Sequence, residues 1–494
     1  MSTLLESFEK TSTSNAAVAI ERPPRLLLIA YNFPPVGGAG VQRPVKWVKN
    51  LRRFGWDVTV LTTENPSVPA RDESLLADIP DDVVVVRART WEPDYRVKQG
   101  LVERSKSASD GIVARAKSAV KDLVKGAIKL ALQPDPQVLW LPNAIRAGRK
   151  IIREVPHDAI LVTAPAYSSF FIGTSLKRTF RLPLVLDFRD EWDMSGRYLE
   201  NAQRDWFSRT IQEAMQRHVL KRADAVVATT KASTANLADK LARLNKPAIR
   251  TATVYNGFDA EDFEPGLGGV VARTARLCEV RSCEHRKGLT DEASARQSFR
   301  LLYTGTLWNL TTIEPLIEAV LRLQSTEPEL VSKLELVCVG RKTSEQSSIL
   351  ERLRATGCRL ELIDYCDHAT VLDWLRSTDA VCLLLGDVAG AERVVPAKLF
   401  EYLANRRDML AIVPRGETAD IVRRYFPEGH IEPKDIDGIA AWLKSRLVGE
   451  AESPARIVET GSIEEFSRTT QTRRLVDLLD ELVRGQIPDG SAGP

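Results

Sequence analysis

Short apolar runs alternate with helical patterns along this chain, and the alternation occurs in two separate series. The first series has the composition of buried parallel strands and occupies residues 25–30, 58–61, 83–86, 159–163, 183–187 and 225–228. The second series occupies residues 300–304, 334–339, 359–363, 380–385 and 410–413. Because parallel strands need a crossover helix between them, the pattern predicts an α/β fold with two tandem Rossmann-like, doubly wound parallel sheets.

The length of 494 residues suits two domains with insertions. We expect the first domain to span residues 22–258 and the second to span residues 299–462. The remaining predicted segments are a disordered lead at 1–21, a linker with a basic insertion at 259–298, a helical segment at 463–485 and a disordered tail at 486–494.

The charge balance and the cysteines exclude several classes of protein. With 69 basic and 66 acidic residues, the chain has no excess charge for nucleic-acid binding. Six scattered cysteines predict no disulfide framework and fit a reducing cytoplasm. Cys278, Cys283 and His285 lack a second ligand pair at zinc spacing, so we expect no metal site. No apolar run reaches the ~20 residues that cross a bilayer, and we expect a cytoplasmic protein.

Residues 101–131 combine basic side chains with apolar residues at helical spacing. Lys117, Lys121, Lys125 and Lys129 recur at steps of four and flank an apolar stripe. A helix of this kind can lie in the interface of an anionic membrane. The pattern predicts peripheral contact with the inner face of the plasma membrane. The alternative is an ordinary surface helix on the first domain.

A glycine-rich loop, residues 33–43, follows the first predicted strand. Gly37, Gly38 and Gly40 let the backbone approach a ligand closely, and the following helix can present its N-terminus to a phosphate. Arg43 stands where a nicotinamide-binding fingerprint has its third glycine, so that fingerprint is incomplete. The loop is either a phosphate-binding loop or only a tight turn.

The most informative stretch is residues 392–404, where a polar loop ends at Pro396 and an amphipathic run begins. Lys398 and Glu401 lie three apart in its first turns. A helix start with a lysine suits a diphosphate, and a carboxylate one turn later can accept hydrogen bonds from a ribose. The alternative is an amphipathic helix that only packs apolar side chains such as Leu399 against a core.

Several of these stretches resemble family 4 glycosyltransferases, which have the GT-B fold. Residues 395–404 read Val-Pro-Ala-Lys-Leu-Phe-Glu-Tyr-Leu-Ala, similar to the V-P-x-K-L-F-E-Y-L-A of many relatives. The glycine loop, the segment Asp187–Trp192 and the inter-domain segment Val254–Asp259 are also similar to family motifs. The resemblance covers residues 25–62, 134–260 and 300–480 approximately.

The resemblance implies a nucleotide-diphosphate sugar donor, retention of anomeric configuration, and no metal or other cofactor. It places the active site in the cleft between the domains and returns the last helix to the first domain. We expect a saccharide acceptor in surface polysaccharide or glycolipid biosynthesis, and the basic segment at 101–131 would suit a lipid-linked one. The alternatives are a GT-B nucleotide-sugar epimerase and a non-catalytic glycosyltransferase-like subunit that binds a nucleotide or a sugar.

The motifs that match the family supply the candidate site residues. The implied catalytic residues are Asp190, Arg189, Lys398 and Glu392. The implied donor-binding residues are Gly37, Gly38, Gly40, Thr306, Arg341, Lys342, Cys366, Arg393, Lys398, Leu399 and Glu401. For Arg189, the alternative is a simple ion pair with Asp187 or Asp190.

The loop after the first strand of the second series departs from the family pattern. Relatives carry an Arg and a Lys there that clamp the diphosphate, whereas this chain has Asn309, Thr311 and Thr312. We expect Arg341 and Lys342, which follow the next strand, to replace them.

The donor motif departs as well. The family carries two glutamates eight residues apart, and Glu401 matches the second. Arg393 stands at the first position, and Glu392 lies one residue earlier. These departures keep the non-catalytic alternative open.

Overall fold

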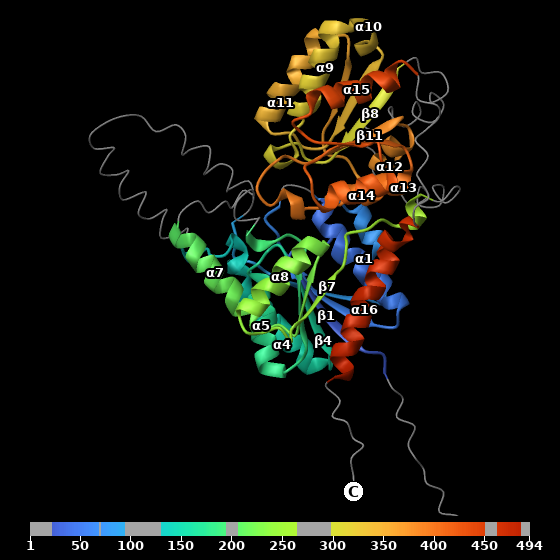
Figure 1. The fold of residues 1–494 in the computed structure, drawn as a ribbon. Helices are drawn as coiled ribbons and strands as arrows, with labels where there is room; N and C mark the ends of the chain where they lie inside the picture. Colours follow the sequence, from blue (N-terminus) through green and yellow to red (C-terminus); the bar gives the residue numbers. More distant parts are fainter. Residues whose placement is uncertain are drawn as a thin grey trace, which may run out of the picture.

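A computed structural model describes residues 22–68, 71–93, 130–193, 206–263, 298–449 and 462–485. They form two α/β domains, one above the other in Figure 1, and the predicted pair of parallel sheets is confirmed. The basic segment expected at 101–131 lies outside the described residues except for its last two. Cys278, Cys283 and His285 also lie outside them.

Seven parallel strands form the sheet of the first domain, in the order β3-β2-β1-β4-β5-β6-β7. They are β1 (Arg25–Ala30), β2 (Asp57–Thr63), β3 (Val84–Ala88), β4 (Ala159–Ala164), β5 (Leu184–Phe188), β6 (Ala225–Ala228) and β7 (Arg250–Thr253). Leu28 of β1 lies opposite Val60 of β2 and Leu161 of β4. All three are fully buried because helices cover both faces of the sheet.

The helices of the first domain lie on opposite faces of its sheet. α1 (Ala39–Arg53) and α16 (Arg468–Arg484) cover one face, where Val45 and Leu479 share a core with Leu28. The other face carries α4 (Leu141–Glu154), α5 (Ser169–Phe180), α7 (Trp206–Leu220) and α8 (Lys231–Arg243). Short 3₁₀ turns are η1 (Ser74–Asp78), η2 (Pro136–Trp140) and η3 (Ala260–Asp262).

Six parallel strands form the sheet of the second domain, in the order β10-β9-β8-β11-β12-β13. They are β8 (Phe299–Thr304), β9 (Leu334–Val339), β10 (Arg359–Ile363), β11 (Ala380–Leu384), β12 (Asp408–Ile412) and β13 (His430–Ile431). Loops after β8 and β9 lie side by side near the centre of the sheet, where ligands of such folds bind.

Helices again cover both faces of this sheet. One face carries α9 (Glu314–Thr326), α10 (Pro328–Val331), α11 (Ser344–Glu351) and α15 (Ile436–Leu447). The other carries α12 (His368–Arg376), α13 (Lys398–Asn405) and α14 (Glu417–Tyr425). The 3₁₀ turns are η6 (Asn309–Thr311), η7 (Arg352–Ala355), η8 (Ala391–Arg393) and η9 (Ile463–Phe466).

Two edge strands are absent from the sequence-based prediction. β7 reads Arg-Thr-Ala-Thr and none of its residues is buried, while β13 has only two residues. An edge strand is less covered than a central one, so neither segment carries the apolar run by which buried strands are recognised.

The chain passes between the domains twice, and the two passages pair with each other. Phe258 N–H donates to the Phe466 carbonyl at 3.2 Å, and Arg468 N–H donates to the Phe258 carbonyl at 2.8 Å. α16 then runs back along the first domain, as the red helix in Figure 1 shows. We call residues 254–259 with residues 466–468 the interdomain crossing.

Candidate active site

Loops from the carboxyl edges of both sheets meet between the two domains. The first domain contributes the loops after β1, β5 and β6, and the second contributes the loops after β8, β9 and β10 and the start of α13. Arg393 Nε lies 2.9 Å from a Glu191 carboxylate oxygen across this junction. Thr230 Oγ1 donates to the Arg393 carbonyl at 2.9 Å. Arg393, Glu191 and Thr230 therefore lie where the two domains touch.

The glycine loop is packed too tightly for side chains. A Cβ on Gly37 would stand 2.7 Å from the Tyr365 hydroxyl of the second domain, and a Cβ on Gly40 would stand 2.0 Å from Arg189 Nη1. Gly38 precedes α1 with φ of 107°, a conformation that favours glycine. The loop thus brings α1, Arg189 and the second domain together.

Arg189 follows β5 and pairs with its neighbour. Its Nη2 lies 2.9 Å from Asp190 Oδ2, while Asp187 is fully buried and is held by Arg43 and by the hydroxyl of Thr163. Of the two pairs considered for Arg189, the structure contains the one with Asp190. Asp190 remains half-exposed beside the glycine loop, so both charges stay at the junction.

Lys398 is the first residue of α13, and its amine is buried. Its Nζ lies 2.9 Å from the Tyr303 hydroxyl and 4.0 Å from the centre of that ring. Burial lowers the pKa of Lys398 to about 7, because among the described residues no carboxylate forms an ion pair with this amine. The site therefore holds a poorly compensated cation at a helix N-terminus, which favours an anionic ligand.

The loops after β8 and β9 press against this lysine. Gly305 has φ of 113°, and a Cβ on it would stand 2.6 Å from Lys398 Nζ. A Cβ on Gly340, with φ of 123°, would stand 2.5 Å from the Gly305 carbonyl oxygen. Only glycines allow both loops to approach the amine so closely.

Other predicted clamp residues lie on the rim of these loops. Thr306 is exposed, and its carbonyl accepts hydrogen bonds from Tyr303 and Thr311. Lys342 Nζ donates to the carbonyls of Gly340 at 2.7 Å and Ile363 at 2.6 Å, so it ties two strand ends together. Arg341 is exposed at the same rim.

Glu401 lies one turn along α13 and is held on one side. His368 Nε2 is 3.1 Å from its Oε1, and Arg468 Nη2 is 3.8 Å from the same oxygen. Burial raises the pKa of Glu401, but the hydrogen bond and charge of His368 and the charge of Arg468 outweigh it, so the pKa lies below its usual range. Glu401 is a partly buried, ionised carboxylate.

Leu399 and Cys366 contribute differently from these charged groups. Leu399 is fully buried with Phe400 and Leu403, so α13 also packs its apolar side against a core. Burial raises the pKa of Cys366 to about 11, which keeps its thiol neutral. Cys366 lies in the loop that leads to His368.

Glu392 and Arg393 pair with each other instead of lining the space beside Lys398. One Glu392 oxygen accepts the Gly390 N–H at 2.9 Å, and the other is 3.0 Å from Arg393 Nη1. Arg393 then reaches Glu191 of the first domain. The structure thus places these two residues at the domain contact and Lys398 with Glu401 deeper in the second domain.

Comparison with known protein families gave a match for the first domain. Residues 37–257, from the glycine loop to the interdomain crossing, match the family model described as a glycosyl transferase 4-like domain. The resemblance to family 4 glycosyltransferases is therefore confirmed. A search of curated proteins found no significant match.

Solved structures share the fold of this chain. A sucrose-phosphate synthase from Thermosynechococcus elongatus is 14% identical, with a TM-score of 0.58 over 94% of this chain and 100% of that one. A glycosyltransferase from Rickettsia africae ESF-5 is 12% identical, with a TM-score of 0.55 over 94% and 100%. A structure described as trehalose-6-phosphate from E. coli, bound with UDP-2-fluoro glucose, is 12% identical, with a TM-score of 0.50 over 93% and 96%. These likenesses confirm the GT-B fold.

Two residues outside the predicted site set, Glu417 and Arg468, also join the two domains. Glu417, in the first turn of α14, accepts hydrogen bonds from the N–H groups of Lys231 at 2.9 Å and Ala232 at 2.8 Å, and from the Tyr255 hydroxyl. Arg468 lies in a helix recognised only by its apolar spacing. Both sets of contacts link residues far apart in the sequence, so sequence reasoning did not predict these pairings.

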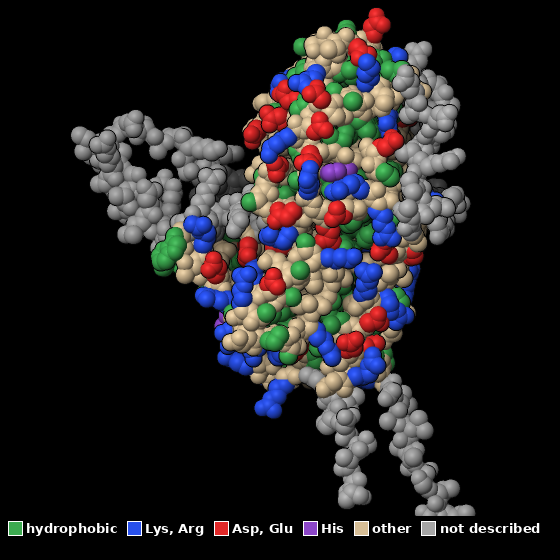
Figure 2. Space-filling view, viewed as in Figure 1, with side chains coloured by type: hydrophobic (Ala, Val, Ile, Leu, Met, Phe, Trp, Pro, Cys, Tyr) green, Lys and Arg blue, Asp and Glu red, His purple; other side chains and the backbone are tan. Residues whose placement is uncertain are grey.

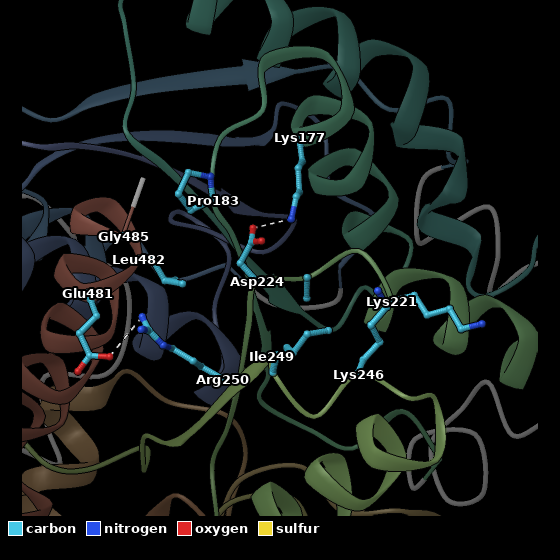
Figure 3. Close-up of a pocket in the computed structure, with 12 residues that line it drawn as sticks. Lys177, Pro183, Lys221, Asp224, Lys246, Ile249, Arg250, Glu481, Leu482 and Gly485 are labelled. Carbon is cyan, nitrogen blue, oxygen red and sulfur yellow. Dashed lines mark hydrogen bonds and ion pairs between the residues drawn. The ribbon is translucent and has the colours of Figure 1, made fainter. Parts of the chain in front are cut away.

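A separate cavity of about 580 Å³ lies at the amino edge of the first sheet, away from the candidate residues. Figure 3 shows Lys177 directed at Asp224 and Arg250 directed at Glu481. Lys and Arg side chains are frequent along this lower edge of the molecule in Figure 2. The cavity contains none of the predicted site residues.

Membrane-spanning helices and metal clusters are absent from the described residues. None of the helices in that part of the chain is both long and apolar enough to cross a membrane. The same residues contain no cluster of His, Cys, Asp and Glu that could hold a metal ion.

Proposed function

We propose that this family 4 protein transfers a sugar from a nucleotide-diphosphate sugar to a saccharide acceptor, with retention of anomeric configuration. The buried amine of Lys398 carries this proposal, because it lies at the start of α13 with a pKa of about 7 and no ion-pair partner among the described residues. A diphosphate would supply the missing counter-charge. The likeness in fold to a structure bound with UDP-2-fluoro glucose supports a nucleotide sugar as the ligand.

The proposed reaction breaks the bond between the anomeric carbon and a diphosphate oxygen. Negative charge grows on the diphosphate, and Lys398 and the helix N-terminus stabilise it. An acceptor hydroxyl bonds to the anomeric carbon, and its proton passes to the departing diphosphate. A preorganised cation or donor of this kind is worth ~3 kcal/mol of barrier. Glu401 would hold the ribose, while Arg189 and Asp190 of the first domain would orient the acceptor.

We further propose that the acceptor is lipid-linked and belongs to surface polysaccharide or glycolipid biosynthesis. The basis is the sequence pattern of residues 101–131, with Lys117, Lys121, Lys125 and Lys129 beside an apolar stripe. Each basic group near an anionic bilayer contributes ~1 kcal/mol of attraction. In a flotation assay with vesicles rich in phosphatidylglycerol, changing these four lysines to glutamine is expected to abolish co-flotation. Equal flotation of both proteins would refute the membrane contact.

The test of the activity begins with thermal shift against UDP-, GDP- and dTDP-sugars, since a ligand that binds only the folded state raises its stability. Nucleotide sugars with one of these bases are expected to raise the melting temperature of the wild type. The Lys398→Met variant should lose this shift. Lys444→Met, which removes an exposed lysine paired with Glu327, is the matched control and should keep it.

Single-turnover assays with the donor that binds then separate the alternatives. Sugar transfer to a saccharide acceptor supports the proposal, and Glu401→Gln should slow it. Binding without any transfer would indicate a non-catalytic subunit, and conversion of the donor without acceptor would indicate an epimerase. No binding of any nucleotide sugar would refute the proposed function.

A further inference from the structure

Arg468 is a buried cation that contacts three separate parts of the molecule. Its Nη2 is 2.7 Å from Gln42 Oε1 on α1, and its Nη1 is 2.9 Å from Asp259 Oδ2 at the end of the first passage between the domains. The same side chain lies 3.8 Å from Glu401 Oε1 on α13. Only 7% of Arg468 is exposed, so these contacts are shielded from solvent.

The backbone of Arg468 is fixed by the interdomain crossing. Its N–H donates to the Phe258 carbonyl, and a Cβ on Gly257 would stand 2.5 Å from the Phe466 oxygen. The glycine therefore allows the two passages to lie in contact. Because α16 packs on α1, Arg468 is held by the first domain although it faces the second.

Asp259 holds the guanidinium of Arg468 in place by an ion pair. Lys46 of α1 lies 2.6 Å from the Asp259 oxygen that Arg468 contacts. Burial raises the pKa of Asp259, but the charges of Arg468 and Lys46 outweigh it and lower the pKa to about 2. Asp259 is therefore always ionised near neutral pH, and Arg468 keeps its place.

Glu401 receives both of its nitrogen partners on the same oxygen. His368, the first residue of α12, is 3.1 Å from Oε1, and Arg468 approaches Oε1 as well. Among the described residues, no hydrogen bond reaches Oε2. A carboxylate held through one oxygen keeps the other in a defined direction for a ligand.

We propose that Arg468 and His368 are positioning residues that fix Glu401 for a ribose diol, so that donor binding in the second domain depends on the seating of α16 on the first. This inference rests on the proposed function. His368 belongs to the second domain and Arg468 is held by the first, so the carboxylate has its full set of partners only while the two domains are in contact. Separation of the domains removes Arg468 and leaves His368 as the remaining partner.

The test compares diol recognition in wild type and in Arg468→Met, which keeps the chain length and removes the charge. Dissociation constants are measured by calorimetry for UDP, GDP and ADP and for the 2′,3′-dideoxy form of the best binder. Loss of the diol should weaken wild-type binding about tenfold or more, as expected for hydrogen bonds to a charged group. Arg468→Met should weaken the natural diphosphate by a similar factor and leave the dideoxy form unchanged.

A structural role alone would give a different result. Arg468→Met would then weaken the binding of the natural and the dideoxy diphosphate equally, and that outcome overturns the proposal. Unchanged binding of the natural diphosphate overturns it as well. Arg473→Met is the matched control, because Arg473 lies on the same helix over the Phe54 ring and does not reach Glu401. It should bind both ligands as the wild type does.

Two further variants keep the result interpretable. If Arg468→Met fails to fold, Arg468→Lys and His368→Gln give the same comparison, and both should reduce the preference for the diol. Glu401→Gln separates this inference from the proposed function. Should Glu401→Gln lose the preference while Arg468 and His368 variants retain it, the positioning role is wrong and the donor site stands. Wild type that binds no diphosphate refutes both.

Discussion

Lys398 shows how one side chain links ligand binding to protonation. Burial beneath Gly305 and beside Tyr303 lowers its pKa to about 7, so a large fraction of the amine is neutral at physiological pH. A bound diphosphate favours the charged form and raises the pKa again. The free protein and its complex should therefore differ in the protonation of this residue.

We predict that binding of a nucleoside diphosphate at pH 8 takes up close to one proton. Calorimetry in buffers of different ionisation enthalpy measures this number directly. Because the pKa of free Lys398 is about 7 and that of the complex is higher, affinity should fall as the pH rises above 7. Lys398→Met should show no uptake, and Lys444→Met should behave as the wild type. Full uptake in Lys398→Met would place the proton elsewhere.

His368 gives a second prediction, on stability. Burial lowers its pKa, but the hydrogen bond and charge of Glu401 and the charge of Asp262 outweigh burial and the repulsion of Arg468, so the pKa lies above its usual 6.5. A raised pKa means that charged His368 stabilises the fold below pH 6.5 and that this contribution disappears as the pH rises through the folded-state pKa.

In urea denaturation, the free energy of unfolding of His368→Gln should therefore be lower than that of the wild type by on the order of 1 kcal/mol at pH 6. This difference should shrink by pH 9. His218→Gln is the control, because burial and Arg222 lower the pKa of His218 and predict the opposite trend. A deficit in His368→Gln that does not change with pH would show that packing, not charge, sets the contribution of His368.

At the scale of elements, α8 begins on a carboxylate from the other domain. Glu417 of α14 accepts the N–H groups of Lys231 and Ala232, while Thr230 caps the Ser233 N–H from within the first domain. The first N–H groups of a helix have no partner inside it, and an anion there is favourable. One helix start thus joins two domains.

Replacement of Glu417 by glutamine should lower the free energy of unfolding by about 1–3 kcal/mol, as two charge-assisted hydrogen bonds weaken. Glu428→Gln is the comparison, since Glu428 is largely exposed and forms a single ion pair among the described residues, with Arg446 at 3.4 Å. Its effect should stay within about 0.5 kcal/mol. Similar losses in both variants, measured by chemical denaturation, would argue against the cap.

The central elements follow from the sequence because buried parallel strands are continuous apolar runs, and β1 is one over all its buried length. Edge strands β7 and β13 lack that signal. Site geometry is harder to predict. Whether Arg189 pairs with Asp187 or with Asp190 depends on Arg43, which lies 144 residues from Asp187 in the sequence. Arg43 forms the ion pair with Asp187, and Arg189 pairs with Asp190. Glu392 and Arg393 likewise pair according to the domain contact, which no local motif encodes.

At the scale of the whole molecule, the interdomain crossing makes two domains behave as one unit. Gly257 has φ of 71°, and a Cβ there would meet the Phe466 carbonyl at 2.5 Å. Phe258 and Phe466 also pack in the core of the second domain. Coupling of the domains therefore depends on close contact between the two passages.

We predict that Gly257→Ala separates thermal unfolding into two transitions, or lowers the single melting temperature by several degrees, in scanning calorimetry. Gly55→Ala is a matched control. Gly55 has a φ of 83° but nothing within 4 Å of its Cβ position, so it tests backbone strain without the contact. If the two variants unfold alike, the effect of Gly257→Ala comes from backbone strain alone, and the contact between the two passages does not couple the domains.

The return of α16 to the first domain also affects synthesis. Leu475 and Leu479 of this last helix fill the same core as Leu26 and Leu28 of the first strand. A ribosome makes β1 before the second domain, but it makes the cover for one face of β1 only after that domain. The nascent first domain must therefore wait, with apolar surface bare, until the second has been made, and chaperones that shield such surface should matter most during that interval.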